Sequence, residues 1–289
     1  MKKHILSYKQ RKYGNNVENI KSKLRKGNMK KFRAGFIQFD VKLGMTDENL
    51  HTVMKYLDDL EKQDVKLVVL PEMWSCGFDN ANLTLHAKRT PEILDILSET
   101  ASKKDMIITG SIPEISGKSI YNTLYVTDRD GSIAGSYRKV HLFSLTSENK
   151  YFTPGDKSII CQTSLGSLGL MICYDLRFPE ISRTLTLKGA NLIIIPAQWP
   201  NVRISRWDIL SQARAIENQV YIIGANRCGK ENTTQFNGHS IIVDPSGKVL
   251  QWAENGNACA LWAEIDMDEL EQVRTYMPSL EERVPRAYD

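Results

Sequence analysis

The sequence of 289 residues predicts a layered α/β protein. From Phe32 onward, short apolar runs alternate with segments whose apolar residues recur at helical spacing. Two pairs of the predicted strands flank turn sequences typical of hairpins, Arg129-Asp130-Gly131 and Pro245-Ser246-Gly247. This alternation indicates sheets covered by helices, with hairpins inserted in the sheets.

The first half of the chain supplies five predicted strands and two predicted helices. The strands are expected at 32–39, 65–70, 105–112, 121–128 and 132–140. One helix is expected over 47–63, where Val53, Leu57 and Leu60 follow helical spacing. A second helix is expected over 91–103, with Thr90 as its cap and Pro91 in its first turn.

The second half repeats the alternation. Strands are expected at 158–164, 168–172, 191–196, 220–226, 239–244, 248–253 and 260–266, and helices at 179–188, 204–218 and 267–274. The strings LVVLPEMW (67–74) and LIIIPAQW (192–199) share four apolar residues, a proline and a tryptophan at the same spacing. They indicate two related sheets that each end a central strand at the same rim, although two short strand-like strings can also agree by coincidence.

Charge divides the chain into a basic leader and a mildly acidic body. Residues 1–28 hold nine of the 38 basic residues and one of the 34 acidic residues. We expect 1–28 to be a disordered N-terminal extension, although a basic stretch can also bind an anionic surface or target an organelle. No low-complexity linker divides the remainder, so residues 29–289 are expected to form one domain.

Composition excludes several classes of function. The acidic body gives no support to a nucleic-acid surface, and no apolar stretch reaches the 18 or more residues of a membrane span. The five cysteines include no CxxC pair, which disfavours a zinc ribbon and a disulfide framework and favours a reducing, cytoplasmic setting. No metal-ligand spacing and no phosphate-binding glycine loop is present, so no metal and no cofactor is expected.

Three predicted strand ends carry reactive side chains: Glu72, Lys139 and Cys173. In α/β proteins, loops at strand ends project functional groups from a rigid sheet. A carboxylate can take the proton of a thiol, and an ammonium can stabilise the oxyanion that follows thiolate attack on an acyl carbon. Together these residue types favour acyl transfer through a thioester.

Each residue also has an ordinary structural interpretation. A glutamate after a strand or a lysine on a hairpin is most often a solvated charge, and a cysteine in an apolar strand is most often buried and inert. His141 offers an alternative base for Cys173 in a cysteine–histidine pair, and the spacing does not exclude it.

Three motifs in order resemble the nitrilase superfamily of carbon–nitrogen hydrolases: PEMWSCGF around Glu72, YRKVHLF around Lys139 and MICYDLRFPE around Cys173. The similarity runs from about Phe32 to Asp266, and ENKYFTPGD (148–156) and RAIENQVYIIGANR (214–227) extend it.

The resemblance implies a four-layer αββα sandwich with the site at one rim of the two sheets. It implies Glu72 as general base, Lys139 as oxyanion stabiliser, Cys173 as nucleophile and Glu148 as a second glutamate that positions Lys139 and the substrate. The backbone N–H of Tyr174 would complete the oxyanion hole. It also implies a homodimer.

Within the superfamily, CYDLRFPE, PAQWP and RAIENQ are most similar to the omega-amidases, which release ammonia from 2-oxo acid monoamides such as 2-oxoglutaramate. True nitrilases tend to carry a tryptophan and a glutamate after the nucleophile, where this chain has Tyr174 and Asp175, so an amide is expected rather than a nitrile. Alternatives are an amidase for deaminated glutathione, an N-carbamoyl amine or an aliphatic amide, a nitrilase, or a binding protein without catalysis.

The expected substrate contacts are two kinds of side chain. Arg177 and Arg203 are basic groups that could hold a substrate carboxylate, although Arg177 could equally form a structural ion pair. Trp74, Phe78 and Trp199 are expected as pocket walls, although each ring could also be ordinary core. Tyr174 is also expected to contact the substrate.

Overall fold

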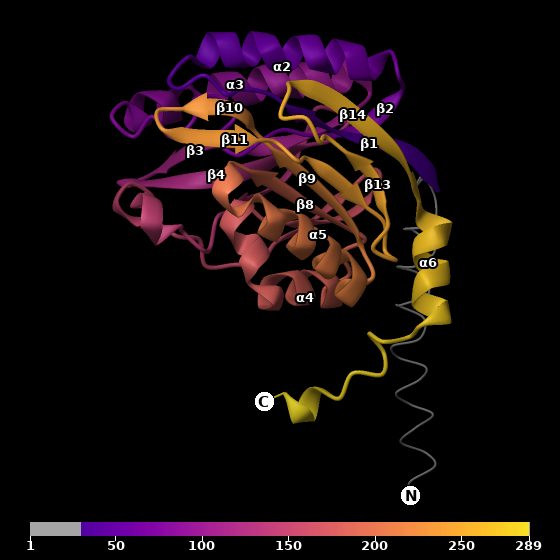
Figure 1. The fold of residues 1–289 in the computed structure, drawn as a ribbon. Helices are drawn as coiled ribbons and strands as arrows, with labels where there is room; N and C mark the ends of the chain where they lie inside the picture. The colour runs from indigo at the N-terminus through magenta and orange to yellow at the C-terminus, as the bar shows by residue number, and fades with distance from the viewer. Residues whose placement is uncertain (1–29, 289) are drawn as a thin grey trace, which may run out of the picture.

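The computed structural model describes residues 30–288 and contains two six-stranded sheets packed face to face, with helices on both outer faces (Figure 1). Helices α2 (Thr46–Glu61) and α3 (Leu83–Lys104) cover the first sheet, and α4 (Pro179–Leu187) and α5 (Ile204–Asn218) cover the second. The predicted αββα sandwich is confirmed. Within residues 30–288, no helix is long and apolar enough to cross a membrane.

The first sheet has the strand order β14-β1-β2-β3-β4-β5. Its members are β1 (Lys31–Gln38), β2 (Val65–Val69), β3 (Ile107–Ser116), β4 (Ser119–Thr127), β5 (Ile133–Arg138) and β14 (Cys259–Asp266). Strands β1, β2 and β3 are parallel, and the others pair antiparallel at the two edges.

The second sheet has the order β13-β12-β9-β8-β7-β6. Its members are β6 (Ile160–Thr163), β7 (Gly166–Leu170), β8 (Leu192–Ala197), β9 (Tyr221–Asn226), β12 (Ile241–Val243) and β13 (Val249–Trp252). Here β7, β8 and β9 are parallel, and antiparallel strands again form the edges. Helix α6 (Met267–Tyr276) follows β14.

The burial of strand β2 on both of its faces explains why its sequence is a continuous apolar run. Side chains alternate between the two faces of a strand. Leu67 and Val69 point into the core between the sheets, whereas Val68 and Leu70 pack against the outer layer with Leu57 of α2. A strand buried on both faces therefore carries no polar alternation.

The two strings that resemble each other in sequence lie together in space. Strand β2 is flanked by β1 and β3, and β8 by β7 and β9. Just beyond them, the Glu72 backbone N–H donates to the Ala197 carbonyl at 3.4 Å. The two central strands thus end at one rim, as the sequence predicts.

Two features of the fold differ from the sequence prediction. Helix α3 begins at Leu83 rather than at Pro91, because Leu83 and Ala87 continue its buried face and Pro91 is accommodated inside the helix. The hairpin of β10 (Cys228–Glu231) and β11 (Thr234–Asn237) was not predicted at all. The basic extension expected over 1–28 lies outside the described residues, and the assignment of 29–289 to one domain stays a prediction.

Candidate active site

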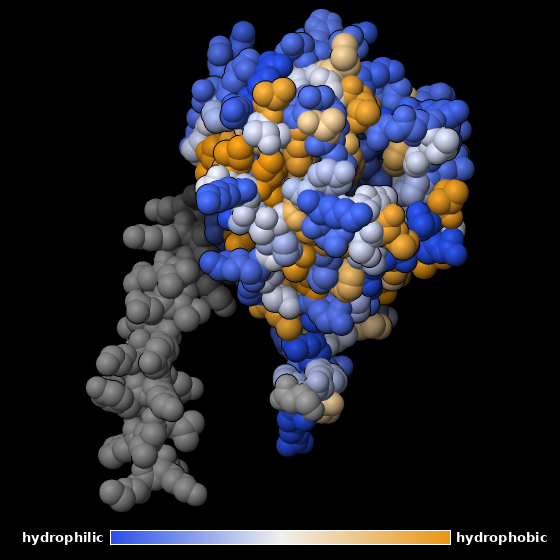
Figure 2. Space-filling view, turned by 90° about the vertical axis from the view of Figure 1, so that its left-hand side faces the viewer, coloured by the Kyte–Doolittle hydropathy of each residue, from blue (hydrophilic) through white to orange (hydrophobic). Residues whose placement is uncertain are grey.

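A cavity of about 550 Å³ opens at the rim where the central strands of both sheets end. The cavity is lined by nine of the residues predicted for the site: Glu72, Phe78, Lys139, Glu148, Cys173, Tyr174, Arg177, Trp199 and Arg203. Trp74, which was also expected as a pocket wall, does not line the cavity, because its ring is fully buried in the outer hydrophobic cluster. The β10–β11 hairpin borders the same cavity through Glu231 and Phe236. Figure 2 looks onto this end of the molecule, where hydrophobic and hydrophilic side chains are intermixed.

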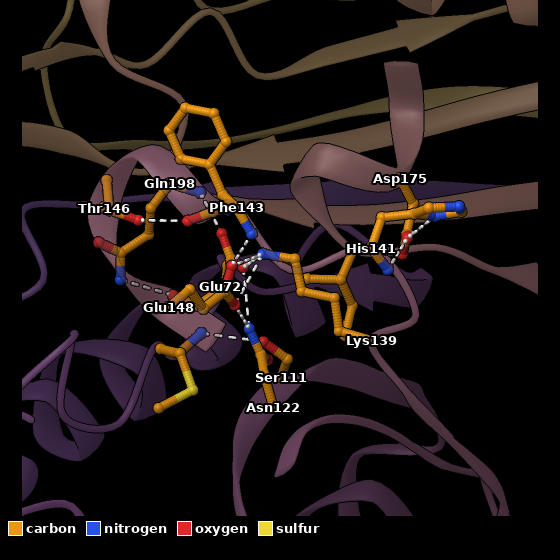
Figure 3. Close-up of polar contacts among 12 residues, drawn as sticks. Glu72, Ser111, Asn122, Lys139, His141, Phe143, Thr146, Glu148, Asp175 and Gln198 are labelled. Carbon is orange, nitrogen blue, oxygen red and sulfur yellow. Dashed lines mark hydrogen bonds and ion pairs between the residues drawn. The ribbon is translucent and has the colours of Figure 1, made fainter. Parts of the chain in front are cut away.

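Glu72 follows β2 and is held on both of its carboxylate oxygens (Figure 3). Lys139 Nζ lies 2.7 Å from Oε1, and the Gln198 backbone N–H donates to Oε2 at 3.0 Å. The side chain is 1% exposed. Burial raises the pKa of Glu72 above its ordinary value, and the neighbouring Lys139 charge offsets part of this rise. A carboxyl with a raised pKa is a better proton acceptor than an ordinary one.

Lys139 follows β5 and forms ion pairs with two buried carboxylates. Its Nζ donates to Glu148 Oε1 and Oε2, each at 2.9 Å, as well as to Glu72. Burial favours a neutral amine, but the charges of Glu72 and Glu148 outweigh burial and raise the pKa of Lys139. The ammonium form is therefore kept in a site from which water is largely removed.

Glu148 lies in a short 3₁₀ turn, Glu148–Lys150, and is 3% exposed. Besides Lys139 it accepts the backbone N–H of Phe143 at 2.7 Å. Glu148 and Glu72 together hold the Lys139 ammonium in place.

Cys173 follows β7 and begins the 3₁₀ turn Cys173–Arg177 with a left-handed backbone, φ 45°. Its thiol interacts with the Glu72 carboxylate and with the backbone N–H of Gln198. Burial and the Glu72 charge raise the pKa of the thiol well above its ordinary value, and Lys139 offsets only part of this. The resting residue is a neutral thiol, so nucleophilic attack requires that a base remove its proton.

A buried carboxylate joins the Cys173 turn to the Lys139 segment. Asp175 is fully buried and accepts the Tyr137 hydroxyl at 2.8 Å and the Ile172 N–H at 2.8 Å. It also accepts the His141 backbone N–H at 3.1 Å and contacts His141 Nδ1 at 2.7 Å (Figure 3). The residues on both sides of Lys139 are thus tied to the turn that carries the thiol.

This arrangement does not support His141 as the base. Its ring nitrogen is engaged by Asp175, its ring stacks on Phe178 with centroids 3.7 Å apart, and it does not line the cavity. Glu72, by contrast, lines the cavity together with Cys173, and its carboxylate acts on the pKa of the thiol.

The cavity walls combine aromatic rings and two arginines. The Arg177 guanidinium lies over the Trp199 ring at 4.8 Å from its centroid, and that of Arg203 lies 5.4 Å from the centroid of Phe143. Neither guanidinium has a carboxylate partner within residues 30–288. Within the described part of the chain, the structural ion pair considered for Arg177 is therefore not formed.

Sequence reasoning missed Asn122, Asp175 and Gln198 as parts of the site. Asp175 and Gln198 stand inside the motifs CYD and PAQW, close to Cys173 and to the end of β8, and that proximity was an available signal. Asn122 lies far from every motif in the sequence. Its place in the site can be recognised only from the pairing of β4 with β5.

Comparison with known proteins agrees with this geometry. A family model described as carbon-nitrogen hydrolase matches residues 33–275. The 2-oxoglutaramate amidase of Bacillus subtilis (strain 168) is 38% identical over 251 residues, which cover 86% of this chain and 96% of that protein. The omega-amidase NIT2 of Mus musculus is 32% identical over 266 residues, covering 88% and 96%. A crystal structure of a carbon-nitrogen hydrolase from Helicobacter pylori G27 matches with a TM-score of 0.85 and 29% identity, covering 90% of this chain and 97% of that one.

A double-sheet sandwich with a thiol, two carboxylates and an ammonium at one rim is the architecture of a hydrolase that acts on carbon–nitrogen bonds. The chain belongs to the carbon–nitrogen hydrolase family. The predictions of a nitrilase-superfamily fold and of an amidase are confirmed, and the relatives named above bear out the resemblance to omega-amidases.

Proposed function

We propose that this amidase is an omega-amidase that hydrolyses the terminal amide of a 2-oxo dicarboxylic acid monoamide such as 2-oxoglutaramate. The observation that carries the proposal is the pair of arginines, Arg177 and Arg203, that line the cavity with Cys173 and have no carboxylate partner in the described chain. Two partly buried guanidinium groups that face the cavity without a carboxylate partner can each pair with a substrate carboxylate.

The cavity charges also favour a 2-oxo acid over the corresponding amino acid. Glu231, the last residue of β10, is a cavity carboxylate that is already paired with the buried Arg227 at 2.6 Å. Glu72 and Glu148 are both engaged by Lys139. Among the described residues that line the cavity, a substrate ammonium would find no unpaired carboxylate, whereas an uncharged oxo group has no such requirement.

The proposed acylation step uses Cys173, Glu72 and Lys139. Glu72 takes the thiol proton as the sulfur attacks the amide carbon, forming the C–S bond of a tetrahedral intermediate. The Lys139 ammonium and the Tyr174 backbone N–H stabilise the oxyanion. The carbonyl then re-forms, the C–N bond breaks, and the proton held by Glu72 passes to the leaving nitrogen, which departs as ammonia.

Hydrolysis of the thioester completes the cycle. Glu72, now ionised again, takes a proton from water as the water oxygen attacks the thioester carbon. Collapse of the second tetrahedral intermediate breaks the C–S bond and returns the proton to sulfur. The carboxylic acid leaves, and Cys173 is again a neutral thiol.

A substrate panel tests this assignment. We expect the largest kcat/KM with 2-oxoglutaramate, against glutamine, propionamide, N-carbamoyl-β-alanine, deaminated glutathione and a nitrile. Ammonia release measures turnover of every compound except deaminated glutathione, for which release of the peptide amine is measured. A higher kcat/KM with any other compound would refute the omega-amidase assignment and favour that substrate class. If a folded protein hydrolysed none of these compounds, the alternative of a binding protein without catalysis would be favoured.

Substitution of the two cavity arginines should lower activity only on the substrates that carry a carboxylate. We expect Arg177→Met and Arg203→Met each to reduce kcat/KM for 2-oxoglutaramate by about 10- to 100-fold, because a charge-assisted hydrogen bond contributes about 1.5–3 kcal/mol. The loss should appear mainly in KM, and activity on uncharged propionamide should change little. Arg206→Met is the matched control, because Arg206 lies on α5 outside the cavity. Equal losses with both substrates would argue against carboxylate recognition.

The proposal includes a homodimer in a reducing, cytoplasmic compartment. Val202, Ile209 and Ile216 are each more than half exposed, and the latter two lie seven residues apart on α5, so they share one helix face. Such an apolar face supports a protein interface. All five cysteines are free, which supports a reducing compartment.

A further inference from the structure

Asn122 connects the two glutamates of the site without lining the cavity (Figure 3). Its Nδ2 donates to Glu72 Oε1 at 2.9 Å and lies 3.4 Å from Glu148 Oε1. The residue belongs to β4 and is 1% exposed, and its Oδ1 has no hydrogen-bond partner. The side chain thus serves these two carboxylates and nothing else in the described chain.

The charges of the site explain why such a donor is needed. Two buried carboxylates face one buried ammonium, so Lys139 can neutralise only one of them. The remaining negative charge depends on neutral donors, which are the Gln198 and Phe143 backbone N–H groups and Asn122 Nδ2. Among these neutral donors, only Asn122 donates to both carboxylates, and its Nδ2 lies between the two negatively charged Oε1 atoms.

We propose that Asn122 is a positioning residue that keeps Glu72 in its proton-accepting form and fixes its distance from Glu148. The inference rests on the proposed function, because it assumes that Glu72 is the base. The backbone supports the same geometry. The Lys139 N–H donates to the Asn122 carbonyl at 2.9 Å, so the residue that holds the two carboxylates also sets the position of the lysine between them.

The ionisation of Glu72 depends on few groups. Lys139 and the Cys173 hydrogen bond favour its charged form, whereas burial and the Glu148 charge disfavour it, and the balance is a raised pKa. Removal of the Asn122 donor would take away a further hydrogen bond to the charged form. The pKa of Glu72 should then rise further, and less of the base would be ionised at a given pH.

The test measures the pH dependence of alkylation of Cys173 by iodoacetamide, followed by mass spectrometry of the labelled peptide. This readout reports the thiol and its base without any assumption about the amide substrate. The variants are Asn122→Leu, which has nearly the same volume but no donor, and Asn122→Ala, which decides the matter if the leucine variant does not fold. In wild type, labelling should slow at low pH as Glu72 becomes protonated, and this part of the profile is the acid limb. The Glu72→Gln variant should lack it, which identifies the acid limb as that of Glu72.

We expect the acid limb of labelling to move up by about one pH unit in the Asn122 variants, since loss of a hydrogen bond to a charged group corresponds to roughly that shift. Below the limb, labelling should be about 10-fold slower than in wild type, and the two rates should converge at higher pH. Asn122→Asp adds a third carboxylate and should move the limb further. Thr127→Val, a buried residue of the same strand whose hydroxyl has no partner, should leave the limb in place.

An acid limb at the same pH as in wild type would overturn the inference. This holds even if the Asn122 variants were labelled more slowly by the same factor at every pH, because loss of a purely structural residue would slow labelling without moving the limb. A limb that persists in Glu72→Gln would also overturn it. If the limb moves as expected while no amide of the panel is hydrolysed, the inference about Asn122 stands and the substrate assignment fails.

Discussion

Cys173→Ala is expected to abolish turnover, with kcat reduced on the order of 10⁵-fold, as for the removal of other covalent nucleophiles. The cavity would still bind substrate, because Arg177 and Trp199 remain. However, no other thiol lines the cavity, so no thioester can form in its place. Ammonia release under saturating substrate measures the loss.

The fold should survive this change. The turn that carries Cys173 is held by the Asp175 carboxylate, which accepts the Ile172 N–H at 2.8 Å, and not by the thiol. The melting temperature should therefore stay close to that of wild type. Cys259→Ala, a half-buried cysteine outside the cavity, is the control and should retain activity. Turnover near the wild-type rate in Cys173→Ala would refute the thioester mechanism.

The main site residues could be predicted from the sequence because each follows a strand that the sequence shows. Glu72, Lys139 and Cys173 come directly after apolar or hairpin runs, and the rim of an α/β sheet collects such residues. The match of 67–74 to 192–199 also indicated that both sheets end at one rim, where the Gln198 N–H now bonds Glu72.

Asn122 could not be placed opposite Lys139 in the same way. The turn at 129–131 predicts the β4–β5 hairpin, but the pairing slips by one residue between Val126 and Thr127. If the residue pairs are counted from the turn and this bulge is ignored, Asn122 is expected opposite Arg138 rather than Lys139. A one-residue slip exchanges the two faces of a strand, so the contact with the carboxylates depends on an irregularity that the sequence does not signal.

Helix α3 and the β10–β11 hairpin were missed for local reasons. Pro91 resembles a first-turn residue, and the helix that precedes it is recognisable only through the buried face of Leu83 and Ala87. The hairpin carries polar residues, and its two-residue loop begins with Asn232 at φ 52°. Its position is set by the buried Arg227, which bonds both Glu231 and the Gln198 side chain.

Glu72→Gln is expected to reduce kcat/KM by about 10³-fold or more, at the upper end of what a general base contributes. The glutamine has the same shape and can still accept the Gln198 N–H, and Lys139 keeps its ion pair with Glu148. The loss therefore reports proton transfer rather than collapse of the site. Since the pKa of Cys173 is raised, the thiol cannot supply its own thiolate at neutral pH.

The pH profile separates this role from a structural one. In wild type, kcat/KM should rise with pH as Glu72 loses its proton, and the limb should lie above pH 4.5, the ordinary value for this carboxyl, because burial raises its pKa. No fall due to Lys139 should follow below about pH 10, because the two glutamates raise the pKa of that ammonium from its ordinary 10.5. In Glu72→Gln the acid limb should disappear. A variant that kept the limb while losing rate would show that another group accepts the thiol proton.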